Sequence, residues 1–220
     1  DVLPDQHTAG TTMTLWLQTL STVLTNVPGI LPTYNAFRRR MYCEGVIGVF
    51  TVLTSVFYHM AETLRRSLLG MSAGQWHRLD NVFALLTFNG LVLNLLDVED
   101  PKELELYRWI CVCVVTWCQE AGPWDIRYTI GPLILPGLFL IVHYFRTGRF
   151  ASMRRMDVFK GAGFIAVAFI FFARGLDEDN DYLRLNHGLW HVFSSIAFHF
   201  FLSAKVLPGE VRSTLNIKLP

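Results

Sequence analysis

The sequence predicts an all-α, polytopic membrane protein that folds as a bundle of seven transmembrane helices. Hydrophobic residues make up 52% of the 220 residues and aromatic residues 14%, and the mean hydropathy is +0.34. This composition is too apolar for one soluble domain of ordinary make-up. The apolar residues also fall into long stretches between short charged segments, and a hydrocarbon core about 30 Å thick needs roughly 20 such residues per helix.

The apolar stretches give seven candidate spans in order along the chain. They cover residues 13–31, 42–60, 79–96, 107–120, 129–145, 158–173 and 187–206. The fourth and sixth are the shortest, and Pro132 and Pro136 interrupt the fifth, where neighbouring helices must satisfy the freed carbonyls. We expect a single domain over residues 1–220, with a polar N-terminal segment at 1–12 and a C-terminal tail at 207–220.

The basic residues indicate how the bundle is oriented. They collect after the first, fifth and seventh stretches, as Arg38, Arg39 and Arg40, then Arg146, Arg149, Arg154, Arg155 and Lys160, then Lys205, Arg212 and Lys218. Because Lys and Arg mark the cytosolic side, we expect an integral, multi-pass protein with its N-terminus outside or lumenal and its C-terminus cytosolic. The same separation, with a net charge of only +1, argues against a nucleic-acid partner, which would need a contiguous basic face.

Four cysteines are present, at Cys43, Cys111, Cys113 and Cys118. Three of them fall inside one apolar stretch, where thiols behave as small hydrophobic groups. We therefore expect this trio to pack in the core and expect no disulfide framework.

Ionisable residues inside membrane spans are costly, so their positions are the best indicators of function. Ser55 and His59 are four residues apart near the end of the second stretch, Asp80 begins the third, and His187 and His191 are four apart at the start of the seventh. Each pair lies on one helix face. With alternating helix directions, all five positions fall at one depth near the outer side of the bundle.

These residue types at one depth predict a metal site. His59, His187 and His191 supply three imidazoles for a zinc ion and leave a fourth position for water, as in catalytic zinc sites. Asp80 is then the candidate general base, and Ser55 orients the water or helps to stabilise an oxyanion. The plainer alternative is that each histidine packs against a backbone carbonyl and that Asp80 caps a helix.

Three further polar residues have secondary roles in this interpretation. His77, three residues before Asp80, is a reserve ligand. We expect Asn89 and Asn94 to bridge helices, although a cavity can use either amide.

The pattern resembles the CREST superfamily of seven-span membrane hydrolases over roughly residues 35–207. Its signature is Ser-x3-His in the second span, Asp in the third and His-x3-His in the seventh. Within it, the chain resembles the branch that contains myomaker and the post-GPI-attachment phospholipase. That likeness rests on the arginine-rich start of the second span, Phe57-Tyr58-His59, Gly131-Pro132 and Asp179-Asn-Asp-Tyr182.

The resemblance implies three zinc-binding histidines and a cavity that holds a membrane lipid. The expected activity is a zinc-dependent intramembrane hydrolase that cleaves an ester or amide bond of a membrane lipid, phospholipase A2-like on a GPI lipid or phospholipid, or ceramidase-like. The alternative is a non-enzymatic seven-span protein with a structural zinc, acting in membrane fusion or as a subunit of a larger membrane assembly. A receptor of the adiponectin type is disfavoured, because the arginine distribution predicts that the N-terminus faces out.

Overall fold

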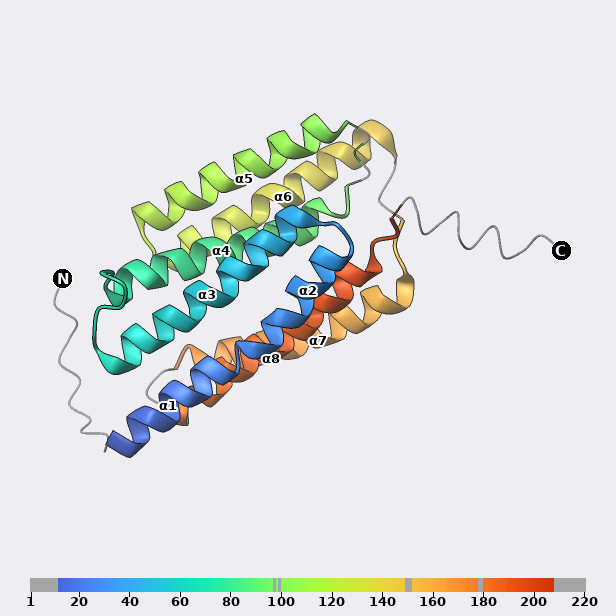
Figure 1. The fold of residues 1–220 in the computed structure, drawn as a ribbon. Helices are drawn as coiled ribbons and strands as arrows, with labels where there is room; N and C mark the ends of the chain where they lie inside the picture. The colour runs from blue at the N-terminus through green and yellow to red at the C-terminus, as the bar shows by residue number, and fades with distance from the viewer. Residues whose placement is uncertain (1–11, 97, 99, 149–151, 178–179, 208–220) are drawn as a thin grey trace.

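The computed structural model describes residues 12–96, 98, 100–148, 152–177 and 180–207, and these form a bundle of long helices with no strand among them (Figure 1). The elements are α1 (Thr12–Leu24), η1 (Val27–Gly29), α2 (Ile30–Arg38), α3 (Tyr42–Leu64), α4 (Ala73–Leu93), α5 (Pro101–Ala121), α6 (Ile126–Thr147), α7 (Arg155–Gly175), η2 (Tyr182–Arg184) and α8 (Leu185–Ala204). The predicted all-α fold is confirmed. The predicted N-terminal segment, apart from Thr12, and the C-terminal tail, apart from Leu207, lie outside the described residues.

The first predicted stretch, 13–31, is two helices and not one. Pro28 has no backbone N–H to continue an α-helix, and the chain passes through the 3-10 turn η1 before α2 begins. The Asn26 side chain donates a hydrogen bond of 2.8 Å to the Thr22 carbonyl at the end of α1. The helical path then runs to Arg38, so it is longer than the apolar stretch that predicted it.

Helices α4 and α5, which correspond to the third and fourth predicted spans, begin earlier than the hydropathy predicts, because their first turns are polar and are stabilised by caps. Ser72 and Gln75 form a capping box at the start of α4, with each side chain bonded to the other residue's backbone N–H. At the start of α5, the Asp100 side chain accepts from the N–H of Lys102. Both helices therefore extend by about six residues beyond the apolar stretches at 79–96 and 107–120, at their N-terminal ends.

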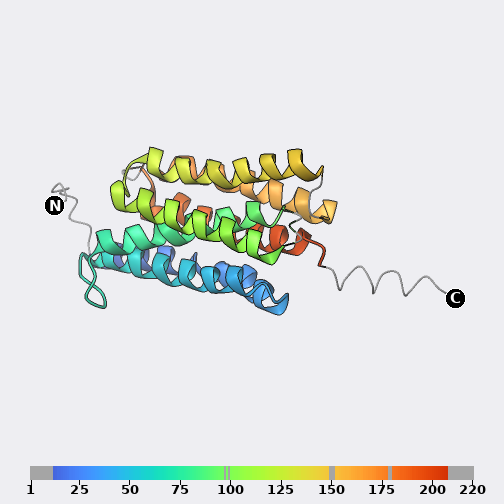
Figure 2. The ribbon, with the colours of Figure 1, turned by 90° about the horizontal axis from the view of Figure 1, so that it is seen from above.

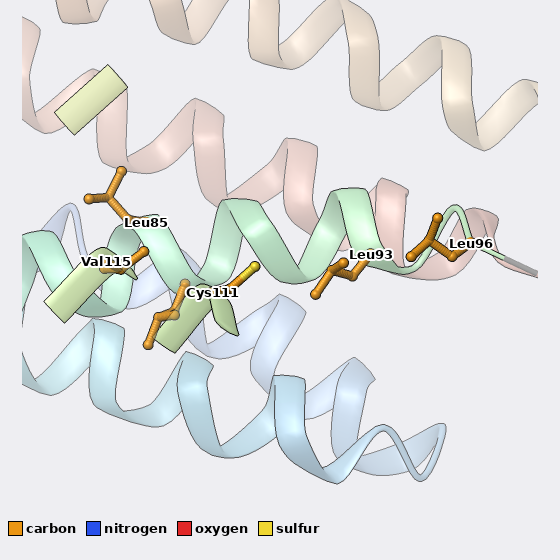
Figure 3. Packing of buried hydrophobic residues seen from close by; sticks show 6 residues of the cluster. Leu85, Leu93, Leu96, Cys111 and Val115 are labelled. Carbon is orange, nitrogen blue, oxygen red and sulfur yellow. The ribbon is translucent and has the colours of Figure 1, made fainter. Parts of the chain in front are cut away.

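The helices run along a common axis, and α1 begins at the opposite end of the bundle from the end of α8 (Figures 1 and 2). Helices α3 and α4 pack together, α5 and α6 cover α4, and α7 packs along α8, while α2 lies against both α3 and α8. A core of buried apolar side chains joins α4 to α5, including Leu85 and Leu93 opposite Cys111 and Val115 (Figure 3). This arrangement brings α3 and α8, which are far apart in sequence, to the same side of α4.

Three helices of the described chain are long and apolar enough to cross a membrane by length and composition, namely α3, α6 and α7. Large apolar side chains also cover the outer face of α6, where Ile130, Ile134 and Leu138 are more than half exposed. Such a continuous apolar surface is typical of contact with lipid or a partner. These three helices and the exposed apolar face of α6 are consistent with a membrane protein.

Of the three cysteines predicted to pack in the core, Cys111 and Cys118 are buried but Cys113 is exposed. Residues two apart on an α-helix point to nearly opposite sides, so Cys111 and Cys113 cannot both face α4. All four cysteines are free thiols.

The basic residues that predict the orientation gather, where they are described, at one end of the bundle. The ends of α2, α6 and α8 and the start of α7 lie there together (Figure 1). The Arg39 guanidinium donates to the Ser203 and Lys205 carbonyls, and Arg154 donates to the Ser203 carbonyl as well. The remaining basic residues of the prediction, Arg149, Arg212 and Lys218, lie outside the described residues, as does Asp179 of the Asp179-Asn-Asp-Tyr182 segment.

Candidate metal centre

Three histidines converge between the end of α3 and the start of α8. His59 is fully buried, and its Nε2 lies 3.2 Å from the Nε2 of His191 and 3.2 Å from the Nε2 of His187. One ring nitrogen from each histidine lies within 4.8 Å of the others. Four-coordinate zinc with Zn–N bonds of 2.0–2.1 Å places its nitrogens about 3.3 Å apart. The two distances from His59 Nε2 therefore match the spacing of ligands in a tetrahedral site.

Hydrogen bonding alone does not explain this convergence. Each imidazole nitrogen offers either one proton or one lone pair, so His59 Nε2 cannot satisfy both neighbours at once. A cation at the centre would accept one lone pair from each ring. Three histidines, one of them fully buried, are thus a donor set suited to zinc or another borderline divalent ion.

A half-buried carboxylate lies beside Nδ1 of the His59 ring. Glu62 Oε2 lies 3.5 Å from His59 Nδ1, too far for a strong hydrogen bond but close enough to favour the tautomer with its proton on Nδ1. Glu62 is held by the Tyr58 hydroxyl, which donates at 2.6 Å, and by Arg184 Nη2, which donates to both carboxylate oxygens at 3.1 Å. A carboxylate behind a ligating histidine is a common feature of metal sites, and it leaves His59 Nε2 free to bind.

The turn before α8 delivers both Arg184 and the α8 histidines. Leu183 and Arg184 both adopt the left-handed conformation, each with φ of 55°, which costs free energy for residues other than glycine. Asp181, which is 4% exposed, accepts hydrogen bonds from the backbone N–H groups of Asn186 and His187 at 2.8 and 3.0 Å. Asp181 therefore caps the first turn of α8, the turn that contains His187.

Ser55 and Asp80 lie at the same end of the bundle as the histidines. Asp80 on α4 lies near the His59 ring and the Ser55 hydroxyl. Ser55 is 2% exposed, and its Oγ makes no hydrogen bond of ordinary geometry within the described protein. Both residues line one cavity of about 380 Å³ together with His187 and His191.

This cavity is long and mostly apolar. It follows α3 from Ser55 to Glu44, a rise of about 16 Å at 1.5 Å per residue. Apolar side chains of α4, α6 and α8 form most of its wall, and Asn26 and Gly29 at the break between α1 and α2 close one side. A volume of several hundred cubic ångströms with few polar groups suits an elongated, largely apolar ligand.

Two residues differ from the sequence-based expectation. The reserve ligand His77 is not part of the histidine cluster; its ring stacks on Trp124 with centroids 3.6 Å apart. Asn89 makes no hydrogen bond of ordinary geometry to a neighbouring helix within the described residues, although it lines the cavity. Spacing alone could not distinguish an amide that faces a cavity from one that faces a helix.

Sequence reasoning missed Glu62, Arg184 and Asp181. Glu62 is three residues after His59, which places it on the same helix face, and this spacing was a usable signal. Arg184 and Asp181 act through a left-handed turn that no periodicity predicts.

Comparison with known proteins places the chain in a family. A search of curated proteins finds no match. A family model described as "Protein of unknown function (DUF3522)" matches residues 14–192. The matched segment contains Ser55, His59, Asp80, His187 and His191, and the chain belongs to this family, DUF3522.

Proposed function

We propose that this protein is a zinc-dependent intramembrane hydrolase that cleaves an ester or amide bond of a membrane lipid. The observation that carries the proposal is the meeting of three histidine Nε2 atoms at one end of an apolar cavity that Ser55 and Asp80 also line. His59, His187 and His191 would hold the ion. The resemblance of these five residues to the CREST signature supports the same assignment.

The protein's own groups have distinct roles in this reaction. When bound, zinc would act as a Lewis acid that polarises a carbonyl group and lowers the pKa of a water molecule. Asp80 accepts a proton from the attacking water, and Ser55 donates a hydrogen bond to the carbonyl oxygen as negative charge develops on it. The acyl chain lies along the cavity towards Glu44, where apolar walls exclude water from it.

The proposal includes a membrane topology. Seven spans, with the α1–η1–α2 segment counted as one, place the described ends at opposite faces of the membrane, with the N-terminus outside or lumenal. The basic residues at the ends of α2, α6 and α8, such as Arg38, Arg146 and Lys205, support a cytosolic position for that end. The histidine centre then lies near the outer face, and a membrane lipid is the partner.

The test is zinc content and lipid hydrolysis of the purified full chain in lipid nanodiscs. We expect about one zinc ion per chain, as a three-histidine site binds, and release of fatty acid from a phospholipid or ceramide panel. His191→Ala should lose both. His199→Ala, eight residues further along α8 and outside the cluster, is the matched control and should keep both.

A second variant separates the ligands from the base. Asp80→Asn should retain zinc and lose hydrolysis by about a hundredfold or more. Full hydrolysis by Asp80→Asn would exclude the general-base role. One zinc per chain with no hydrolysis of any lipid would instead favour the non-enzymatic alternative, in which zinc joins α3 to α8 in a protein of membrane fusion or a larger assembly.

A further inference from the structure

A second pocket lies at the end of the bundle opposite the histidine centre. Its volume is about 340 Å³, and Arg40, Glu44, Asn94, Arg108 and Lys205 contribute to its wall. Glu44 precedes His59 by 15 residues of α3, a rise of about 22 Å. The pocket is therefore distant from the proposed metal centre, although it shares Cys43, Glu44 and Arg108 with the far end of the first cavity.

The charges on this pocket are mainly positive. Among the described residues of its wall, three are basic and one is acidic. Arg108 Nη2 lies 2.6 Å from Glu44 Oε1, so this pair balances and Arg40 and Lys205 carry the excess positive charge. Arg40 stands in the turn between α2 and α3 with φ of 61°, a left-handed conformation that turns the chain at the pocket. An arriving anion would meet more positive than negative charge.

The N-terminus of α3 forms part of the same wall. Met41 is its N-cap residue and makes no side-chain capping hydrogen bond, and residues 41–44 all line the pocket. The first N–H groups of a helix have no partner within the helix and carry the positive end of its dipole. A helix of 23 residues that begins at a pocket therefore favours an anion there.

Asn94 gives an independent indication of the ligand. The residue is 5% exposed, it lines the pocket, and its Nδ2 has no hydrogen-bond partner among the described residues. A buried N–H without an acceptor is unfavourable unless a ligand supplies one. The unmet group is a donor, and the guanidinium, ammonium and helix N–H groups around it are donors too. The ligand must then offer several acceptor oxygens.

We propose that this pocket, where Asn94, Arg40, Arg108 and Lys205 surround the N-terminus of α3, binds a phosphate group. Phosphate offers acceptor oxygens in several directions and pairs well with guanidinium groups and helix N-termini. The residues of the pocket come from the start of α3 and the ends of α4 and α8, and these helix ends lie together at one end of the bundle (Figure 1). This is the level expected for lipid headgroups. The phosphate of an anionic phospholipid is therefore the first source, and free phosphate is the second.

The experiment measures equilibrium binding of dioctanoyl phosphatidic acid and, separately, of inorganic phosphate to the purified full chain in a neutral detergent. Asn94→Leu removes the donor and should weaken binding about tenfold, the value of one hydrogen bond to a charged group. Arg40→Gln should weaken it severalfold. The matched controls are Asn89→Leu, in α4 and lining the other cavity, and Arg38→Gln, at the last residue of α2, and both should bind as the wild type does.

Each outcome decides the proposal. Binding of the lipid alone, sensitive to Asn94→Leu and Arg40→Gln, supports a phospholipid headgroup, and equal binding of inorganic phosphate supports a free phosphate site. No binding of either, or binding that both variants leave unchanged, overturns the proposal. Arg40 is exposed, so Arg40→Gln should fold even if Asn94→Leu does not. Because neither measurement involves zinc or hydrolysis, the result is independent of the function proposed above.

Discussion

Replacing Glu62 by Gln tests whether the carboxylate behind His59 sustains the candidate metal centre. Gln has nearly the same shape as Glu but carries no negative charge. The carboxylate that it replaces accepts hydrogen bonds from Tyr58 and Arg184 and lies 3.5 Å from His59 Nδ1. Carboxylates in this position typically contribute 10- to 100-fold in metal affinity. The expected loss in zinc affinity is therefore about 1.4–2.7 kcal/mol.

The same change should destabilise the metal-free protein. The Arg184 side chain is 6% exposed, so its charge loses its main partner in a buried setting. A hydrogen bond to a charged group contributes about 1.5–3 kcal/mol, but the 29% exposure of Glu62 lets water compensate in part. We expect about 1–2 kcal/mol of lost stability. Two independent quantities, zinc affinity and stability, should thus fall together.

The assay is competition with a chelator for zinc, followed by thermal unfolding of the chelated protein in detergent. Glu120→Gln is the matched control, because it breaks the Arg78–Glu120 ion pair of 2.8 Å, in which the Glu120 side chain is 65% exposed. Such surface pairs contribute at most about 1 kcal/mol. A Glu62→Gln protein with zinc affinity within twofold of the wild type would refute the reasoning.

Two further predictions concern the start of α8. Asp181→Ala should cost about 1–2 kcal/mol, because the N–H groups of Asn186 and His187 lose their acceptor, and thermal unfolding measures this loss; an unchanged Tm would show that the cap contributes nothing. Gly175→Ala should lower zinc affinity, since a Cβ there would lie 3.0 Å from the His187 backbone nitrogen and push this histidine away. Gly163→Ala, on the same helix and with nothing within 4 Å of the added Cβ, should instead stabilise the protein by up to about 1 kcal/mol; zinc affinities that do not differ between the two glycine variants would contradict this account.

Hydropathy was sufficient to place the long helices and insufficient to find their ends. The stretch at 42–60 became α3, whose last turn carries Glu62, a charged residue that a search for apolar runs excludes. Capped polar turns extended α4 and α5 in the same way. The break between α1 and α2 was missed because the apolar stretch continues through Pro28. Proline interrupts a helix because it lacks a backbone N–H, and hydropathy does not report this property.

The five candidate site residues could be found because they form two local pairs and one acid at the start of an apolar stretch, and the structure brings them to one end of the bundle. Local spacing fixed which histidines share a face, and alternating helix direction fixed their depth. The supporting groups depend on tertiary structure. Arg184 reaches Glu62 across 122 residues of sequence, and no pattern in a single chain reports such a contact.

The left-handed pair Leu183 and Arg184 has a consequence for the motions of the protein. Each residue gives up about 1–2 kcal/mol that glycine would not lose, so the turn before α8 is held by Asp181 and the Glu62 contact and not by its own backbone. Segments of this kind open locally before the rest of a fold. Backbone amides near the start of α8 should therefore exchange with deuterium sooner than those in the middle of α3, and the rate of metal release should follow the opening of this turn.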